Sequence, residues 1–123
     1  MITHRQVVAR VRYWRKVLRL TEWEIVVDGE PPEDEDGAAD CDCKPEYLLA
    51  RLRFDRKTLT TIEEIDSAVI HELVHLPTWK LAAAAETMAD GDKRLLKWVH
   101  DEDEGLVTYL ERLVVHLMKG RAG

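Results

Sequence analysis

The stretch His71-Glu72-Leu73-Val74-His75 constrains this chain more than any other, because it has the form H-E-x-x-H. Two histidines at this spacing lie one above the other on the same face of an α-helix. Their imidazoles can therefore share one Zn²⁺ ion as neutral nitrogen donors. Glu72 follows the first histidine directly, so its carboxylate can accept a proton from water beside the ion without being a ligand. The motif predicts a zinc site with a general base next to it.

The flanking residues predict that the motif lies late in a helix over residues 61–76. Thr61 stands three residues before Glu64, which is the spacing of a capping box, and an apolar run follows. Pro77 is expected to end this helix or to limit it sharply. The two histidines lie beside the apolar stripe, as a half-buried metal would need. The stripe recurs at helical spacing and consists of Ile62, Ile65, Val69, Leu73 and Leu76.

Length and composition predict a single soluble domain over residues 1–123 with one hydrophobic core. Apolar residues make up 46% of the chain and charged residues 34%, which is typical of a globular protein and not of a disordered one. The net charge of −6 argues against a general nucleic-acid binder. The sequence lacks both an apolar run of about 20 residues for spanning a bilayer and the apolar core of a signal peptide. We therefore expect a cytoplasmic protein without membrane association.

Cys41 and Cys43 are separated by one residue, which is too close for an unstrained disulfide. In a reducing cytosol we expect both to be thiols. A second metal site is the alternative, but the pair lacks further Cys or His residues nearby. We favour two small side chains that face the same way on a short strand over residues 39–44.

The rest of the chain predicts an α+β fold. An amphipathic helix is expected over residues 4–20, and its basic face is either solvated or a partner-binding surface. Alternating apolar residues predict strands over residues 23–28 and 48–55, which with the cysteine strand form a small three-stranded, largely antiparallel sheet. This sheet is expected to pack on the N-terminal helix, the H-E-x-x-H helix and a C-terminal helix that ends near Met118. An acidic loop over residues 29–37, a helical segment over 82–88 and a break at 89–92 complete the outline.

Two histidines do not complete a catalytic zinc site, which requires a third protein ligand and leaves a position for water. The longer motif H-E-x-x-H-x-x-G-x-x-H is absent, because Thr78 and Leu81 stand where its glycine and its last histidine would be. The third ligand must therefore come from elsewhere in the sequence. The dense cluster over residues 100–104, at the start of the last helix, is the obvious source.

Helical geometry orders the candidates within this cluster. Glu104 lies at the border of the apolar face of the last helix, Asp103 falls within that face, and His100 lies one turn earlier. We rank Glu104 first and keep Asp103 and His100 as alternatives. Acidic residues in the first turn of a helix also have an ordinary explanation, because the helix dipole favours negative charge there.

These motifs together resemble the zincin metallopeptidases, and within them the small gluzincin-like proteins encoded by phages and actinobacteria. The resemblance covers most of the chain. It implies an α+β zincin core, one Zn²⁺ held by His71, His75 and Glu104, Glu72 as the general base, and a peptide or protein substrate in a cytoplasm that includes that of a phage-infected host. The matching features are Tyr13-Trp14 in the first helix, the Trp23 strand, Tyr47 before an alternating strand, residues 71–76, and the pattern E-x-x-V-x-x-L at Glu104, Val107 and Leu110.

One position departs from this family. Gluzincins often carry E-x-x-x-D, whose Asp orients a ligating histidine, and here that position is Thr108. Asp66, Asp103 or a backbone carbonyl could take its place. A peptidase also needs a group that stabilises the oxyanion. The candidates are Tyr47, Tyr109, His100 and His116.

Three functions follow from these observations. The first is a zinc-dependent peptidase in which His71, His75 and Glu104 hold the metal and Glu72 acts as base. The second is a zinc-binding adaptor or inhibitor on a zincin scaffold, since a short chain leaves little mass for a deep substrate cleft. The third is a structural α+β domain without metal.

Overall fold

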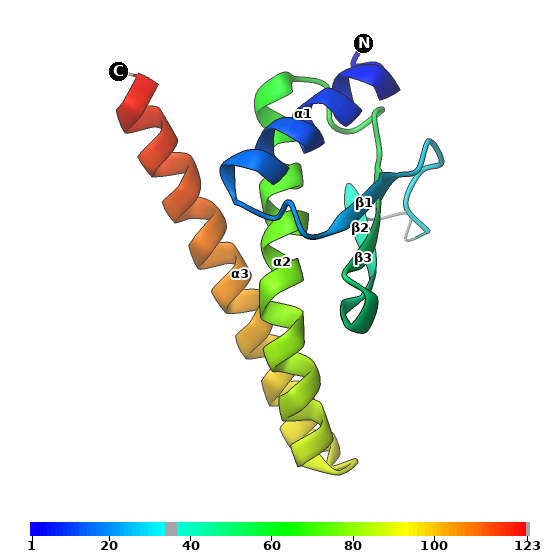
Figure 1. Ribbon diagram of the computed structural model, residues 1–123, viewed down its shortest axis with the longest axis vertical. Helices are drawn as coiled ribbons and strands as arrows, with labels where there is room; N and C mark the ends of the chain where they lie inside the picture. Colours follow the sequence, from blue (N-terminus) through cyan, green and yellow to red (C-terminus); the bar gives the residue numbers. More distant parts are fainter. Residues whose placement is uncertain (34–36, 123) are drawn as a thin grey trace. The chain divides into compact units, whose positions relative to one another are not determined.

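A computed structural model describes residues 1–33 and 37–122, and these residues form the α+β fold that the sequence predicts (Figure 1). They divide into two compact units, Met1–Leu73 and Val74–Gly123, which are described separately below. The prediction of one domain therefore stays a prediction. Part of the acidic loop, residues 34–36, lies outside the described residues.

The first unit begins with helix α1 (His4–Val17), somewhat shorter than the predicted 4–20. Thr3 caps the helix, because its hydroxyl accepts from the Gln6 backbone N–H at 3.2 Å and the Gln6 side chain accepts from the Thr3 N–H at 2.8 Å. Val7, Val11 and Trp14 form the buried stripe, as their spacing predicts.

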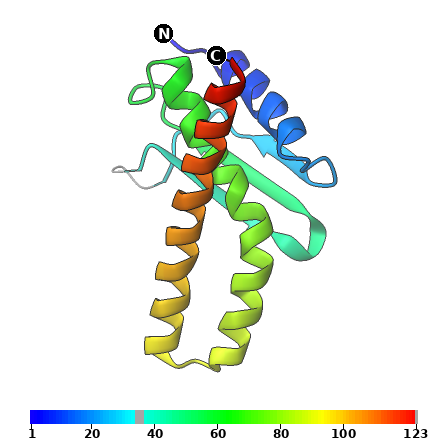
Figure 2. The same cartoon turned by 90° about the vertical axis from the view of Figure 1, so that its left-hand side faces the viewer.

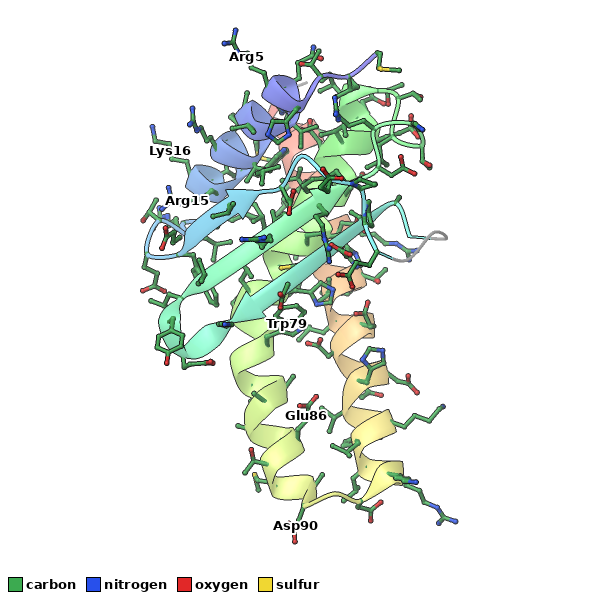
Figure 3. The ribbon with its side chains drawn as sticks, turned by 90° about the vertical axis from the view of Figure 1, so that its right-hand side faces the viewer. Arg5, Arg15, Lys16, Trp79, Glu86 and Asp90 are labelled. Carbon is green, nitrogen blue, oxygen red and sulfur yellow. The ribbon has the colours of Figure 1, made fainter. Side chains whose placement is uncertain are left out.

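The sheet of the first unit contains β1 (Glu24–Val27), β2 (Ala39–Lys44) and β3 (Leu49–Phe54), with a short helix η1 (Pro45–Tyr47) between the last two. Its strand order is β1-β3-β2 (Figure 3). β2 pairs with β3 in antiparallel register, whereas β1 pairs with β3 in parallel register. The sheet is therefore mixed: its longer pairing is antiparallel, as expected, and the parallel pairing of β1 was not predicted. The reason is that β3 lies between β1 and β2, so β1 does not pair with its neighbour in sequence.

Helix α2 (Ile62–Ala89) supplies the other half of the core of the first unit with its residues 62–73. Alternate residues of β3 are buried, as its pattern predicts, with Ala50 and Leu52 fully buried and Phe54 nearly so. The apolar stripe of α2 is equally well buried at Ile65 and Val69. Trp23, Ile70 and Leu73 are also buried.

A polar contact links α1 to α2 within the first unit. The Asp66 carboxylate accepts from Arg10 Nε at 2.6 Å and Nη2 at 2.9 Å, and from Trp14 Nε1 at 2.9 Å. A bidentate guanidinium–carboxylate pair is among the stronger polar contacts in proteins. Asp66 is therefore committed to holding α1, which argues against it as the residue that orients a ligating histidine.

Helix α2 continues through Pro77, so the prediction that the helix ends there was wrong. Proline removes the N–H that would bond to the carbonyl of Leu73. Strong helix formers at residues 82–88 favour helix beyond it, and the Thr78 hydroxyl donates to the His75 carbonyl at 3.1 Å in the same turn. The first unit ends at Leu73, the residue whose carbonyl would accept the missing N–H.

The second unit is a hairpin of two antiparallel helices, formed by residues 74–89 of α2 and by α3 (Lys93–Ala122) (Figure 2). The predicted break is confirmed: Asp90 and Gly91 adopt positive φ values of 51° and 80°, and glycine accommodates such a turn readily. The Asp92 side chain caps α3 by accepting from the Arg94 N–H at 2.9 Å. Among the described residues, no helix is both long and apolar enough to cross a membrane.

Candidate metal centre

His71 and His75 lie one turn apart on the unbroken helix α2, as the motif predicts. The His75 side chain is almost fully buried, whereas His71 is half-buried. Trp79 lies one further turn along, and its ring centroid is 5.3 Å from that of His75 (Figure 3). Sequence reasoning missed Trp79, although the i,i+4 spacing from His75 places it on the same helix face.

Glu104 comes from α3 and lies against His75 within the second unit. Its Oε1 atom is 3.3 Å from His75 Nε2. This separation suits two ligands of one ion, because donors held at about 2.0–2.1 Å around a tetrahedral zinc are about 3.3 Å apart. His71, His75 and Glu104 each offer one ligand atom, and these atoms all lie within 4.8 Å of one another.

The structure therefore brings together the three predicted ligands, and this cluster could hold a metal ion. Two imidazole nitrogens and one carboxylate oxygen form a donor set that zinc accepts, with one position left for water. The chemistry of the residues thus fits the metal that the motif implies. This fit does not by itself select zinc over another divalent transition metal, because imidazole also binds copper, iron and nickel.

The two alternative ligands lie differently. His100 is exposed on α3. Asp103 approaches the other side of the His75 ring. Its Oδ2 atom is 3.6 Å from Nδ1, whereas Glu104 lies near Nε2. Neither residue belongs to the group of three that could hold an ion.

Glu72, the predicted general base, is buried in the first unit with about 8% of its surface exposed. Burial and, to a lesser extent, the negative charge of the Glu72 carboxylate raise the pKa of the Cys41 thiol on β2 well above its usual range. Both cysteines are free, as predicted, and Cys41 and Cys43 share the less exposed face of their strand.

The four candidates for stabilising the oxyanion are all surface residues. Tyr47 and Tyr109 are exposed, as are His100 and His116. Their assignment stays a prediction.

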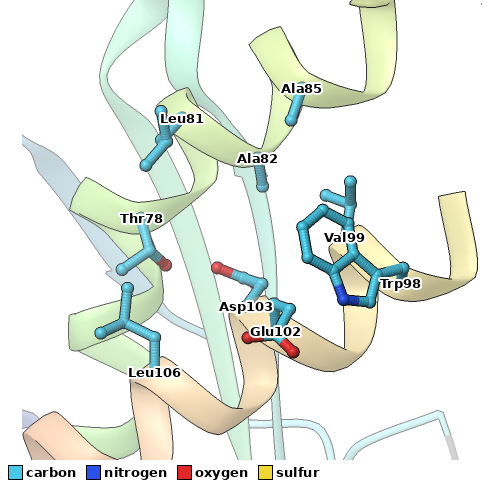
Figure 4. A pocket seen from close by; sticks show the side chains of 9 residues that line it. All are labelled: Thr78, Leu81, Ala82, Ala85, Trp98, Val99, Glu102, Asp103 and Leu106. Carbon is cyan, nitrogen blue, oxygen red and sulfur yellow. The ribbon is translucent and has the colours of Figure 1, made fainter. Parts of the chain in front are cut away.

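A small apolar cavity of about 190 Å³ lies in the second unit, between the two helices of the hairpin (Figure 4). Thr78 and Asp103 border it, and both contact His75, through the carbonyl and through Nδ1 respectively. The rest of the lining is mainly apolar and includes Leu81, Ala82, Ala85, Trp98, Val99 and Leu106.

Comparison of the chain with protein-family models, with curated proteins and with solved structures gave no match. The motif and the geometry of its residues are therefore the features that point to a function.

Proposed function

We propose that this protein is a zinc-dependent peptidase whose metal ligands are His71, His75 and Glu104 and whose general base is Glu72. The observation that carries the proposal is the convergence of three donors from α2 and α3 within 4.8 Å of one another. The glutamate that follows the first of these histidines is buried. A divalent ion in such a site lowers the pKa of water and polarises a carbonyl group.

Glu72 would be the acid–base residue of the reaction. Glu72 would take the proton of the attacking water and return it to the leaving amine. Its burial supports this role, because an acid–base group in a site shielded from solvent acts more strongly on its neighbours.

The sheet offers a place for an extended substrate. β2 is an edge strand, and the charge of Glu72 acts on the thiol of its residue Cys41. Edge strands bind extended peptides by adding a strand through main-chain hydrogen bonds. This arrangement would bring a peptide bond alongside the general base.

A zinc-binding adaptor is the second candidate, and the exposed apolar side chains of the second unit favour it. Trp98 is 62% exposed and Leu81 70% exposed, and large exposed apolar side chains often mark sites of protein association. On α1, by contrast, Arg10 and Arg15 are engaged within the first unit, which leaves less of the basic face for a partner.

The decisive experiment compares wild type with Glu72→Gln and with Glu63→Gln, an exposed glutamate in the first turn of the same helix. Zinc content is measured by elemental analysis and cleavage with a peptide library read by mass spectrometry. We expect both variants to keep zinc, and Glu72→Gln alone to lose cleavage by about 10²–10⁴-fold. Cleavage by Glu72→Gln at the wild-type rate would contradict the proposal. Zinc binding by a wild type that cleaves no peptide would favour the adaptor.

A further inference from the structure

Two consecutive acidic residues of α3 flank the two ring nitrogens of one histidine. Glu104 Oε1 lies 3.3 Å from His75 Nε2, and Asp103 Oδ2 lies 3.6 Å from His75 Nδ1. All three residues belong to the second unit. The two carboxylates therefore lie near different nitrogens of the imidazole, although they are neighbours in sequence.

Burial separates the two carboxylates further. The Asp103 side chain is 10% exposed, whereas that of Glu104 is 43% exposed. Asp103 borders the mainly apolar cavity together with side chains of both helices, including Ala82 of α2 and Leu106 of α3 (Figure 4). A carboxylate in such surroundings is costly unless a specific partner compensates it. His75, with its side chain 6% exposed, is the partner that the geometry offers.

We infer that Asp103 is a positioning residue that orients His75 for the metal. In this role its carboxylate accepts the Nδ1–H of His75, which leaves the lone pair of Nε2 directed toward the site that Glu104 borders. The distance of 3.6 Å is longer than a hydrogen bond, so this role requires the Asp103 carboxylate to lie closer to Nδ1 when the metal is bound. The inference rests on the zinc site of the proposed function, but not on peptidase activity.

One further observation supports Asp103 over Asp66, the other carboxylate considered for this role. Asp66 is engaged by Arg10 and Trp14 at 2.6–2.9 Å.

A purely structural ion pair is the competing explanation. In it, a protonated His75 would lie between two carboxylates without any metal. The two explanations differ in what zinc does: a positioning residue changes zinc affinity, whereas a structural pair changes only stability.

The test measures the zinc dissociation constant, by competition with a chromophoric chelator, for wild type, Asp103→Ala and Asp103→Asn. Asp101→Asn is the matched control, because Asp101 lies in the same stretch of α3 with 57% of its side chain exposed. Removing the partner of a ligating histidine costs about 10–100-fold in metal affinity. We expect that loss for Asp103→Ala, a smaller loss for the isosteric Asn, which keeps an acceptor oxygen, and no change for the control.

A second readout follows the Nδ1 proton of His75 by NMR in the zinc-loaded protein. A bond to a carboxylate shifts this proton downfield and slows its exchange with water, and we expect both effects to disappear in Asp103→Ala. Wild-type zinc affinity and an unchanged Nδ1 proton in Asp103→Ala would overturn the inference. Should the Ala variant not fold, the same comparison with Asn decides. A wild type that binds no zinc would overturn both proposals, whereas zinc binding without cleavage would remove the peptidase and leave the role of Asp103 intact.

Discussion

The two halves of α2 are stabilised differently, although they form one helix. In residues 62–73, which belong to the first unit, the apolar stripe is fully buried at Ile65, Val69 and Leu73. In residues 74–89, Val74 and Leu76 are still buried, but further along the helix Leu81 is 70% exposed and Met88 85% exposed. Burial of apolar surface is therefore the main source of stability for the first half of the helix. The second half depends more on helix propensity and on the contacts of His75 with Trp79 and α3.

The largest expected effect compares the same residue type in the two halves. Leu73→Ala should lower the free energy of unfolding by about 2–5 kcal/mol, because it removes buried methyl groups and leaves a cavity. Leu81→Ala should change it by about 0.5 kcal/mol or less. Urea denaturation followed by circular dichroism, with a chelator present to exclude metal effects, measures both. Equal losses would show that the two halves are packed alike.

A smaller difference in stability is expected when a partly buried polar contact of the first unit and an exposed one of the second unit are each removed. Asp66→Asn should lower the free energy of unfolding by about 1–3 kcal/mol, because it removes the negative charge to which Arg10 and Trp14 both donate hydrogen bonds. The control Asp101→Asn removes an exposed i,i+4 pair with Lys97 and should cost about 0.3–0.5 kcal/mol. The same urea denaturation measures both variants. A cost for Asp66→Asn no larger than that of the control would mean that α1 is held by apolar packing alone.

The smallest effect appears only at alkaline pH. Burial raises the pKa of Cys43 from its usual 9.0 to about 11, and that of Cys41 further still. Because the unfolded chain releases these protons first, their contribution to stability is complete below about pH 9 and is lost as the pH rises through the folded-state pKa. The stability of wild type should therefore fall between about pH 9 and pH 11 more steeply than that of a Cys41→Ser, Cys43→Ser variant. Parallel pH profiles of the two proteins would contradict this reading of the cysteine strand.

Local pattern was enough to predict the elements that carry the site. The spacing of His71 and His75, the alternation along β3 and the shared face of Cys41 and Cys43 each depend on the geometry of a single helix or strand. The alternation along β3 and the shared face of the two cysteines are confirmed. Glu104 was predicted in the same way, from its place at the border of the apolar face of α3; it lies in a cluster with the two histidines that could hold a metal ion, and its role as ligand stays a prediction.

Features that depend on pairing between distant segments were not predictable in the same way. The parallel pairing of β1 with β3 follows from where β3 inserts, which no local pattern encodes. The continuation of α2 past Pro77 reflects helix-forming residues beyond it that outweigh one missing hydrogen bond. The position of Asp103 beside Nδ1 of His75 required the packing of α3 on α2 within the second unit.

The central claim is that His71, His75 and Glu104 hold one divalent ion. Protein freed of metal with a chelator is titrated with zinc, and the bound zinc per chain is measured by elemental analysis. The account predicts one ion per chain for wild type and for His100→Ala, an exposed histidine of α3, and a loss of at least tenfold in affinity for His75→Ala and Glu104→Ala. A wild type that binds no zinc, or zinc binding unaffected by His75→Ala, would contradict it.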